Sequence, residues 1–149
     1  MDRYRLRGAW VDWISSRGYT QTATLVFNDY DITRFDAQLS LKELHARLDR
    51  LALGKLWQKK PVEERLDSIS FIENPATNLH YHMLWRAPRL EEELVEALPG
   101  IWRKLVPSGN AKNRAIVPDD HIFWYDTKQL VDGSFIFSSD FHSFTQTPA

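Results

Sequence analysis

The feature that most constrains the fold is a turn flanked by two strand-like stretches, within residues 66–86. Residues 74–78, Asn-Pro-Ala-Thr-Asn, are typical of a tight turn because Asn and Pro favour turn conformations. Residues 66–74 before the turn and 79–86 after it carry the aromatic and aliphatic side chains that strands favour. We therefore expect an antiparallel hairpin, which fixes the side chains that share a face.

Strand parity in this hairpin predicts a cluster of metal-ligating side chains. His80 and His82 are two residues apart, so they point to the same face of their strand. If the turn centres on Ala76 and Thr77, Glu73 lies directly across from His80, with Cβ atoms about 4.5–5.5 Å apart. A register shifted by one residue would separate these side chains. One carboxylate and two imidazoles can bind Mn²⁺, Mg²⁺, Co²⁺ or Zn²⁺ and leave positions for water and a phosphate oxygen.

The rest of the chain alternates between helical and strand patterns. An amphipathic helix is predicted by four leucines that recur at spacings of three and four: Leu41, Leu44, Leu48 and Leu51. This alternation predicts an α+β fold, an antiparallel-rich central sheet flanked by helices. We expect helices over residues 6–16, 33–54, 90–106 and 118–131, further strands over 19–28, 114–117 and 135–137, and a loop over 107–110.

Composition narrows the class of protein. The 149 residues are 43% hydrophobic, enough for one domain with its own core. No apolar run approaches the roughly 18–20 residues that cross a bilayer, and the chain has no cysteine, so we expect a cytoplasmic protein without membrane association. The net charge is −1, but basic residues gather in 42–60 and 101–114. Such stretches are typical either of solvated helix faces or of a short nucleic-acid footprint.

A tyrosine in the expected helix 118–131 faces away from the apolar sector of that helix. Tyr125 is flanked there by His121, Lys128 and Gln129. Lys128 shares its face, and an ammonium group at this position favours the phenolate or neutralises phosphate charge. The alternative is an ordinary exposed tyrosine beside a lysine. A metal ion together with a phenolic nucleophile would provide the chemistry that breaks a phosphodiester and holds the broken end covalently.

These motifs, Glu73 with His80-Tyr81-His82 and then Tyr125-Asp126-Thr127-Lys128, resemble the HUH endonucleases of the rolling-circle replication initiator type. The segment Thr24-Leu25-Val26-Phe27-Asn28 is similar to the first-strand motif of that family, and the resemblance covers roughly residues 19–131. The resemblance implies an RRM-like variant of the ferredoxin-like fold in a single domain over residues 1–149. In that domain, residues 1–18 would be an N-terminal extension and 132–149 a C-terminal strand and tail. It also implies Mn²⁺ or Mg²⁺ on the Glu73 and histidine cluster, Tyr125 as the single catalytic nucleophile and Lys128 as its assistant.

The activity implied by the resemblance is metal-dependent, site-specific nicking and joining of single-stranded DNA through a 5′-phosphotyrosyl intermediate. Its role would be to start rolling-circle replication of a plasmid or phage. The implied partners are single-stranded or hairpin DNA at an origin, a host helicase and a polymerase. Four residues are expected to contact the DNA: Lys112, Arg114, His121 and Gln129.

Two departures from the family pattern leave other functions open. Asp126 places an acid beside the nucleophile and opposes phenolate formation, and the Trp-rich residues 1–18 have no family counterpart. The alternatives are a transposase-like or REP-associated nuclease, a catalytically inactive DNA-binding regulator, and a generic α+β ligand-binding module.

The remaining histidines and tryptophans are expected to serve the fold. His45 and His142 have no partners predicted from the sequence, so we expect them at the surface. Four tryptophans are expected to pack in the interior rather than to stack on bases: Trp57, Trp85, Trp102 and Trp124.

Overall fold

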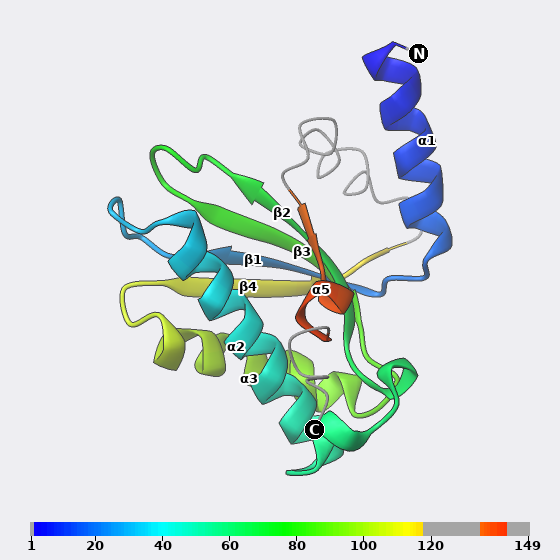
Figure 1. Cartoon of the computed structure of the whole chain (residues 1–149), viewed down its shortest axis with the longest axis vertical. Coiled ribbons are helices and arrows are strands. Elements are labelled where there is room, and N and C mark those ends of the chain that lie inside the picture. Colours follow the sequence, from blue (N-terminus) through cyan, green and yellow to red (C-terminus); the bar gives the residue numbers. More distant parts are fainter. Residues whose placement is uncertain (1, 118–134, 143–149) are drawn as a thin grey trace.

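The computed structural model describes residues 2–117 and 135–142. In these ranges the chain forms a five-stranded antiparallel sheet flanked by helices, which confirms the expected α+β class (Figure 1). The expected helix 118–131, which carries Tyr125, lies outside the described residues. The described helices are α1 (Arg3–Ser16), α2 (Arg34–Leu53), α3 (Glu91–Leu105) and α5 (Ser138–His142), with short 3-10 turns at Trp57–Lys59 and Val62–Glu64. The described strands are β1 (Gln21–Val26), β2 (Asp67–Glu73), β3 (His80–Arg86), β4 (Asn110–Ala115) and β5 (Phe135–Phe137).

The hairpin of β2 and β3 forms at the centre of the sheet, whose strand order is β4-β1-β3-β2-β5. Its register pairs Glu73 with His80 and Phe71 with His82, as strand parity predicts. Asn74 adopts a positive φ of 49° in the turn, a conformation that Asn tolerates better than most residues. The turn and the alternating side chains therefore specify one register.

One face of the sheet is covered by α2 and α3, whereas α1 rises from the other side (Figure 1). Thr33 caps α2 by accepting a hydrogen bond from the amide of Asp36 at 3.0 Å, and Gly54 ends the helix at a φ of 87°. Trp102 of α3 donates its indole N–H to the carbonyl of Val26 at 3.0 Å, which ties α3 to β1. The expected helices 33–54 and 90–106 are thus confirmed to within two residues at each end.

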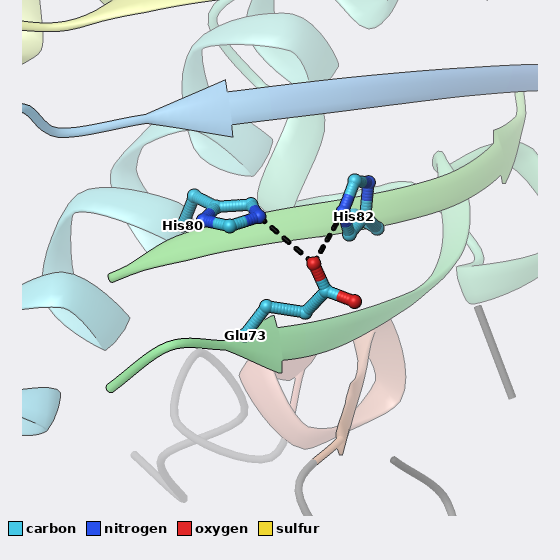
Figure 2. A group of neighbouring side chains, drawn as sticks. All are labelled: Glu73, His80 and His82. Atoms are coloured by element: carbon cyan, nitrogen blue, oxygen red, sulfur yellow. Dashed lines mark hydrogen bonds and ion pairs between the residues drawn. The ribbon is translucent and has the colours of Figure 1, made fainter. Parts of the chain in front are cut away.

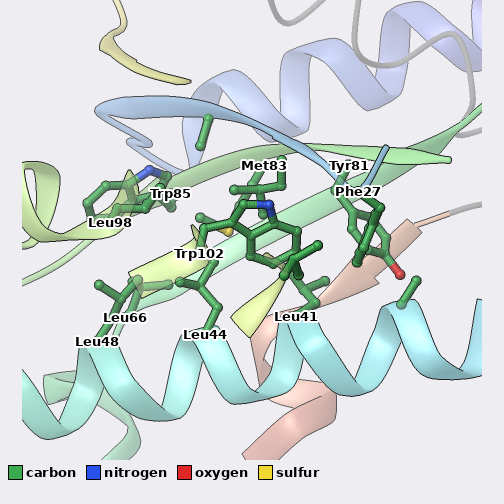
Figure 3. Close-up of a cluster of buried hydrophobic side chains, with 14 of the residues drawn as sticks. Phe27, Leu41, Leu44, Leu48, Leu66, Tyr81, Met83, Trp85, Leu98 and Trp102 are labelled. Atoms are coloured by element: carbon green, nitrogen blue, oxygen red, sulfur yellow. The ribbon is translucent and has the colours of Figure 1, made fainter. Parts of the chain in front are cut away.

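The main core lies between the sheet and these two helices (Figure 3). Tyr81, Met83 and Trp85 project from β3 into it, on the face opposite His80 and His82. Full burial of each large apolar side chain contributes about 1.5–3 kcal/mol. Three of the four tryptophans expected in the interior are buried, and the fourth, Trp124, lies outside the described residues. Those three are Trp57, Trp85 and Trp102.

Strand β4 begins and ends earlier than expected. The sequence predicts a loop over 107–110 and a strand over 114–117, but the strand spans Asn110–Ala115 and, among the described strands, pairs only with β1. Its residues show no apolar alternation because it is an edge strand of the described sheet, where polar and charged side chains oppose further pairing. Gly109 precedes it where a Cβ atom would collide with the carbonyl of Val26, so only glycine fits.

His45 is buried, so its expected place at the surface is wrong. Its Nδ1 lies 2.8 Å from the carbonyl of Leu41, and its Nε2 lies 2.7 Å from Oγ of Ser68. Its ring packs against Phe141 of α5, with centroids 4.9 Å apart. Helix α5 occupies part of the expected polar tail, and at five residues it is too short for helical periodicity to reveal. No helix among the described residues combines the length and apolar character needed to cross a membrane.

Candidate metal centre

The hairpin presents three potential metal ligands on the face of the sheet opposite the main core (Figure 2). Oε2 of Glu73 lies 2.9 Å from Nε2 of His80 and 2.9 Å from Nε2 of His82. The three ligand atoms lie within 4.8 Å of one another. The described residues therefore form the predicted group that is able to hold a metal ion.

These distances suit a compact coordination geometry. Metal–ligand bonds of about 2.1 Å that meet at right angles place neighbouring ligand atoms about 3 Å apart. Both nitrogen–oxygen distances in the cluster are close to that value. Three protein ligands would leave further positions on a bound cation for water and a substrate oxygen.

The surroundings of His80 favour a cation in the cluster. Nδ1 of His80 lies 3.0 Å from the carbonyl oxygen of Asn78, which can only accept, so this contact places a proton on Nδ1. Nε2 faces the Glu73 carboxylate, which also accepts when ionised. Neutral imidazole has a single N–H, so both contacts are favourable only if a second proton or a metal ion lies between Nε2 and the carboxylate.

His82 is oriented by a residue of the neighbouring strand. Its Nδ1 lies 3.4 Å from Oγ1 of Thr24 in β1, and Nε2 is directed at Glu73. Partners of this kind fix the ring orientation of metal-binding histidines. The sequence interpretation missed Thr24 and the carbonyl of Asn78 as supporting groups. Side chains alternate between the two faces along β1, so Thr22 and Thr24 share a face. This alternation was the sequence signal that could have identified Thr24.

The cluster is sheltered from solvent. The side chains of Glu73, His80 and His82 are 8%, 15% and 13% exposed. Burial of an ionised carboxylate is unfavourable unless cationic or hydrogen-bonding groups compensate it. A second proton or a bound cation between the imidazoles and the carboxylate would supply that compensation.

Two of the expected DNA-contacting residues lie on the same face as the cluster. Thr24 pairs with His82 on one side and with Lys112 on the other, so the three residues point the same way. Arg114 follows Lys112 by two residues and shares its face, and both side chains are exposed. At about 4.8 Å between strands, β4 lies roughly 10 Å from β3. Positive charge is therefore available beside the cluster.

The other basic stretch lies elsewhere. Residues 42–53 of the stretch 42–60 belong to α2, which covers the opposite face of the sheet. Of the remaining site residues predicted from the sequence, four lie outside the described residues: His121, Tyr125, Lys128 and Gln129. Phe135, the first described residue after them, pairs with Phe71, which pairs with His82.

Two of the five tyrosines of the chain are unsuited to nucleophilic attack. Burial raises the pKa of Tyr81 to about 12, and its ring lies in the core on the face opposite the metal cluster. Burial also raises the pKa of Tyr19, which is 5% exposed. Tyr4 and Tyr30 are exposed, near the start of α1 and in the turn after β1.

Comparison with known proteins identifies no relative of this chain. No protein-family model, curated protein or solved structure matches the chain. The function must therefore be argued from the residues themselves.

Proposed function

We propose that the protein is a metal-dependent endonuclease that nicks and rejoins single-stranded DNA through a covalent tyrosyl intermediate. The observation that carries this proposal is the convergence of Glu73, His80 and His82 in the register that the motif requires. Exposed Lys112 and Arg114 on the same face add the positive charge that a DNA backbone needs.

Glu73, His80 and His82 would hold Mn²⁺ or Mg²⁺. When bound, this cation supplies Lewis-acid polarisation of the scissile phosphate. Mixed nitrogen and oxygen ligation also accepts Co²⁺ and Zn²⁺, so the choice of Mn²⁺ or Mg²⁺ rests on the family resemblance. The protein contributes ring orientation through Thr24 and the carbonyl of Asn78.

Tyr125 is the proposed nucleophile. Its phenolic oxygen forms a bond to phosphorus, and the bond from phosphorus to the 3′ oxygen breaks. The phenolic proton passes to solvent, and the departing 3′ oxygen takes up a proton. This leaves a 5′-phosphotyrosyl link and a free 3′-hydroxyl, and the reverse reaction rejoins the strand. Lys128 assists by stabilising negative charge as it develops.

The proposed substrate is single-stranded or hairpin DNA at a replication origin. Lys112 and Arg114 would contact its backbone, with His121 and Gln129 as further contacts. The free 3′-hydroxyl would prime a polymerase, and a host helicase would unwind the duplex, as the initiator resemblance implies.

The test is to incubate the protein with Mn²⁺ and a panel of labelled single-stranded hairpins. We expect a protein–DNA band that survives denaturation. Tyr125→Phe should abolish this band while DNA binding changes little, because the variant loses only the attacking oxygen. Tyr30→Phe, which alters an exposed tyrosine in the turn after β1, is the matched control and should keep the band.

Other outcomes point to the alternatives. A band retained by Tyr125→Phe contradicts the assignment of the nucleophile. Hairpin binding without any metal-dependent nicking contradicts the enzyme and favours a DNA-binding regulator. Nicking restricted to hairpins of repeated extragenic elements favours the transposase-like function over replication initiation.

A further inference from the structure

The tryptophans of α1 form an aromatic surface with β5 on the same side of the sheet as the metal cluster. Trp10 packs against Phe135 with ring centroids 5.8 Å apart, and Trp13 packs against Phe137 at 5.8 Å. The two tryptophans are 5.6 Å apart and the two phenylalanines 5.5 Å. These four residues, Trp10, Trp13, Phe135 and Phe137, are called the aromatic wall below.

Strand register links the aromatic wall to the metal cluster. Phe135 pairs with Phe71, and Phe71 pairs with His82, so these three residues point to the same face. Strands β5 and β3 are two positions apart in the sheet, which corresponds to roughly 10 Å at about 4.8 Å per strand. A strand of DNA that crosses the cluster toward β5 therefore reaches the wall.

Trp13 is the accessible part of the aromatic wall. It is 40% exposed, whereas Ile14 beside it is fully buried. Packing of α1 on the sheet explains the burial of Ile14 but leaves part of the Trp13 ring in water. Part of the Trp13 ring is therefore accessible to a ligand.

Positive charge accompanies the exposed ring. The guanidinium carbon of Arg17 lies 5.1 Å from the centroid of Trp13, and its Nη2 also pairs with Asp67 at 3.0 Å. Residues 2–17 contain four arginines against two aspartates, although the whole chain has a net charge of −1. Exposed aromatic rings beside arginines are the combination with which proteins bind single-stranded nucleic acids.

We propose that α1 extends the DNA-binding surface and that Trp13 stacks on a base of the single strand, with Arg17 near the adjacent phosphate. This inference rests on the proposed function for its choice of DNA. It gives the Trp-rich N-terminal segment a role that the family resemblance does not provide. Base stacking on one aromatic side chain corresponds to roughly tenfold in affinity.

The test measures binding of fluorescein-labelled dT12 by anisotropy at low salt with EDTA present, so that nicking plays no part. Trp13→Ala should weaken binding about tenfold, and Trp13→Phe, which keeps a ring, should stay within about threefold of the wild type. Phe35→Ala is the matched control because Phe35 is 70% exposed on α2, the helix that covers the opposite face. It should leave dT12 affinity unchanged.

Intrinsic fluorescence separates stacking from a merely structural role. Stacking on thymine should quench the fluorescence of Trp13. The total tryptophan fluorescence of Trp13→Phe should therefore fall less on addition of dT12 than that of the wild type, although both bind dT12 with similar affinity. The inference is overturned if Trp13→Ala binds dT12 like the wild type, if Phe35→Ala weakens binding equally, or if quenching is the same in Trp13→Phe.

Failure of this inference is distinguishable from failure of the proposed function. If the protein forms a covalent hairpin adduct but its affinity for dT12 does not depend on Trp13, the nuclease is supported and the aromatic wall is not part of its DNA-binding surface. If dT12 binding depends on Trp13 but no adduct forms, the aromatic wall is supported as a single-strand binding surface and the proposed nuclease activity is contradicted.

Discussion

The hydroxyl of Thr24 lies 3.4 Å from Nδ1 of His82, so a residue of β1 contacts a metal ligand presented by β3. Because Thr24 also pairs with Lys112 in β4, the cluster is connected to the basic edge of the sheet through one residue. The candidate site therefore depends on β1 and β4 as well as on the hairpin of β2 and β3.

Thr24→Val should weaken Mn²⁺ binding about tenfold, because loss of a supporting hydrogen bond leaves the His82 ring less well oriented. Isothermal titration calorimetry measures the effect directly. The matched control is Thr22→Val on the same face of the same strand, where the residue pairs with Leu84 instead of a metal ligand. Equal affinity in the wild type and Thr24→Val would show that the contact does not orient the ring.

Glu73→Gln should weaken Mn²⁺ binding more than Thr24→Val does, because it removes the negative charge shared by both imidazoles. The same titration applies, and we expect a loss of well over tenfold. Glu63→Gln, which alters an exposed carboxylate in the short turn Val62–Glu64, is the control. Binding unchanged in Glu73→Gln would exclude the cluster as the metal site.

The metal cluster was predictable because period-two alternation and one turn determine which residues of a hairpin meet. Glu73 and His80 pair as parity requires. The contact of Thr24 with His82 was not predicted because β1 and β3 are far apart in sequence. The bounds of β4 were not predicted correctly because an edge strand needs no apolar alternation. His45 was misplaced since its partner Ser68 comes from another element.

Asp49 should make stability depend on pH. It is 3% exposed and accepts a hydrogen bond from the amide of Leu66 at 2.8 Å. Burial raises the pKa of Asp49 to about 6, above the ordinary value of about 3.9. The folded state therefore binds a proton more tightly than the unfolded state, and stability falls as the pH rises from about 4 to about 6.

The full shift in pKa corresponds to about 3 kcal/mol, of which roughly 2 kcal/mol is lost between pH 4 and pH 6 because Asp49 is still half protonated at the upper end. Asp49→Asn keeps an acceptor for the Leu66 amide but does not titrate. Between pH 4 and pH 7, the free energy of unfolding measured by urea denaturation should fall more for the wild type than for Asp49→Asn, by up to that amount. A difference between the two proteins that is the same at both pH values would contradict the prediction.

Two glycine substitutions should change stability in opposite directions. A Cβ atom at Gly109 would collide with the Val26 carbonyl and Cγ1 of Val106, so Gly109→Ala should cost about 1–3 kcal/mol. Gly100 lies within α3 with no neighbouring atom within 4 Å of such a Cβ, so Gly100→Ala should stabilise by about 1 kcal/mol. Thermal denaturation compares the two variants, and a stabilised Gly109→Ala would contradict the close approach of β4 to β1.

Lys112→Gln should lower the salt dependence of single-strand binding. One lysine that neutralises one phosphate contributes about 0.7 to the slope of log affinity against log salt concentration for single strands. The measurement is dT12 anisotropy over a range of NaCl concentrations with EDTA present. Lys55→Gln is the control, because this exposed lysine follows α2, away from the face that carries the cluster. If both variants keep the wild-type slope, DNA does not run over β4; if only Lys112→Gln lowers it, the backbone passes beside the metal cluster.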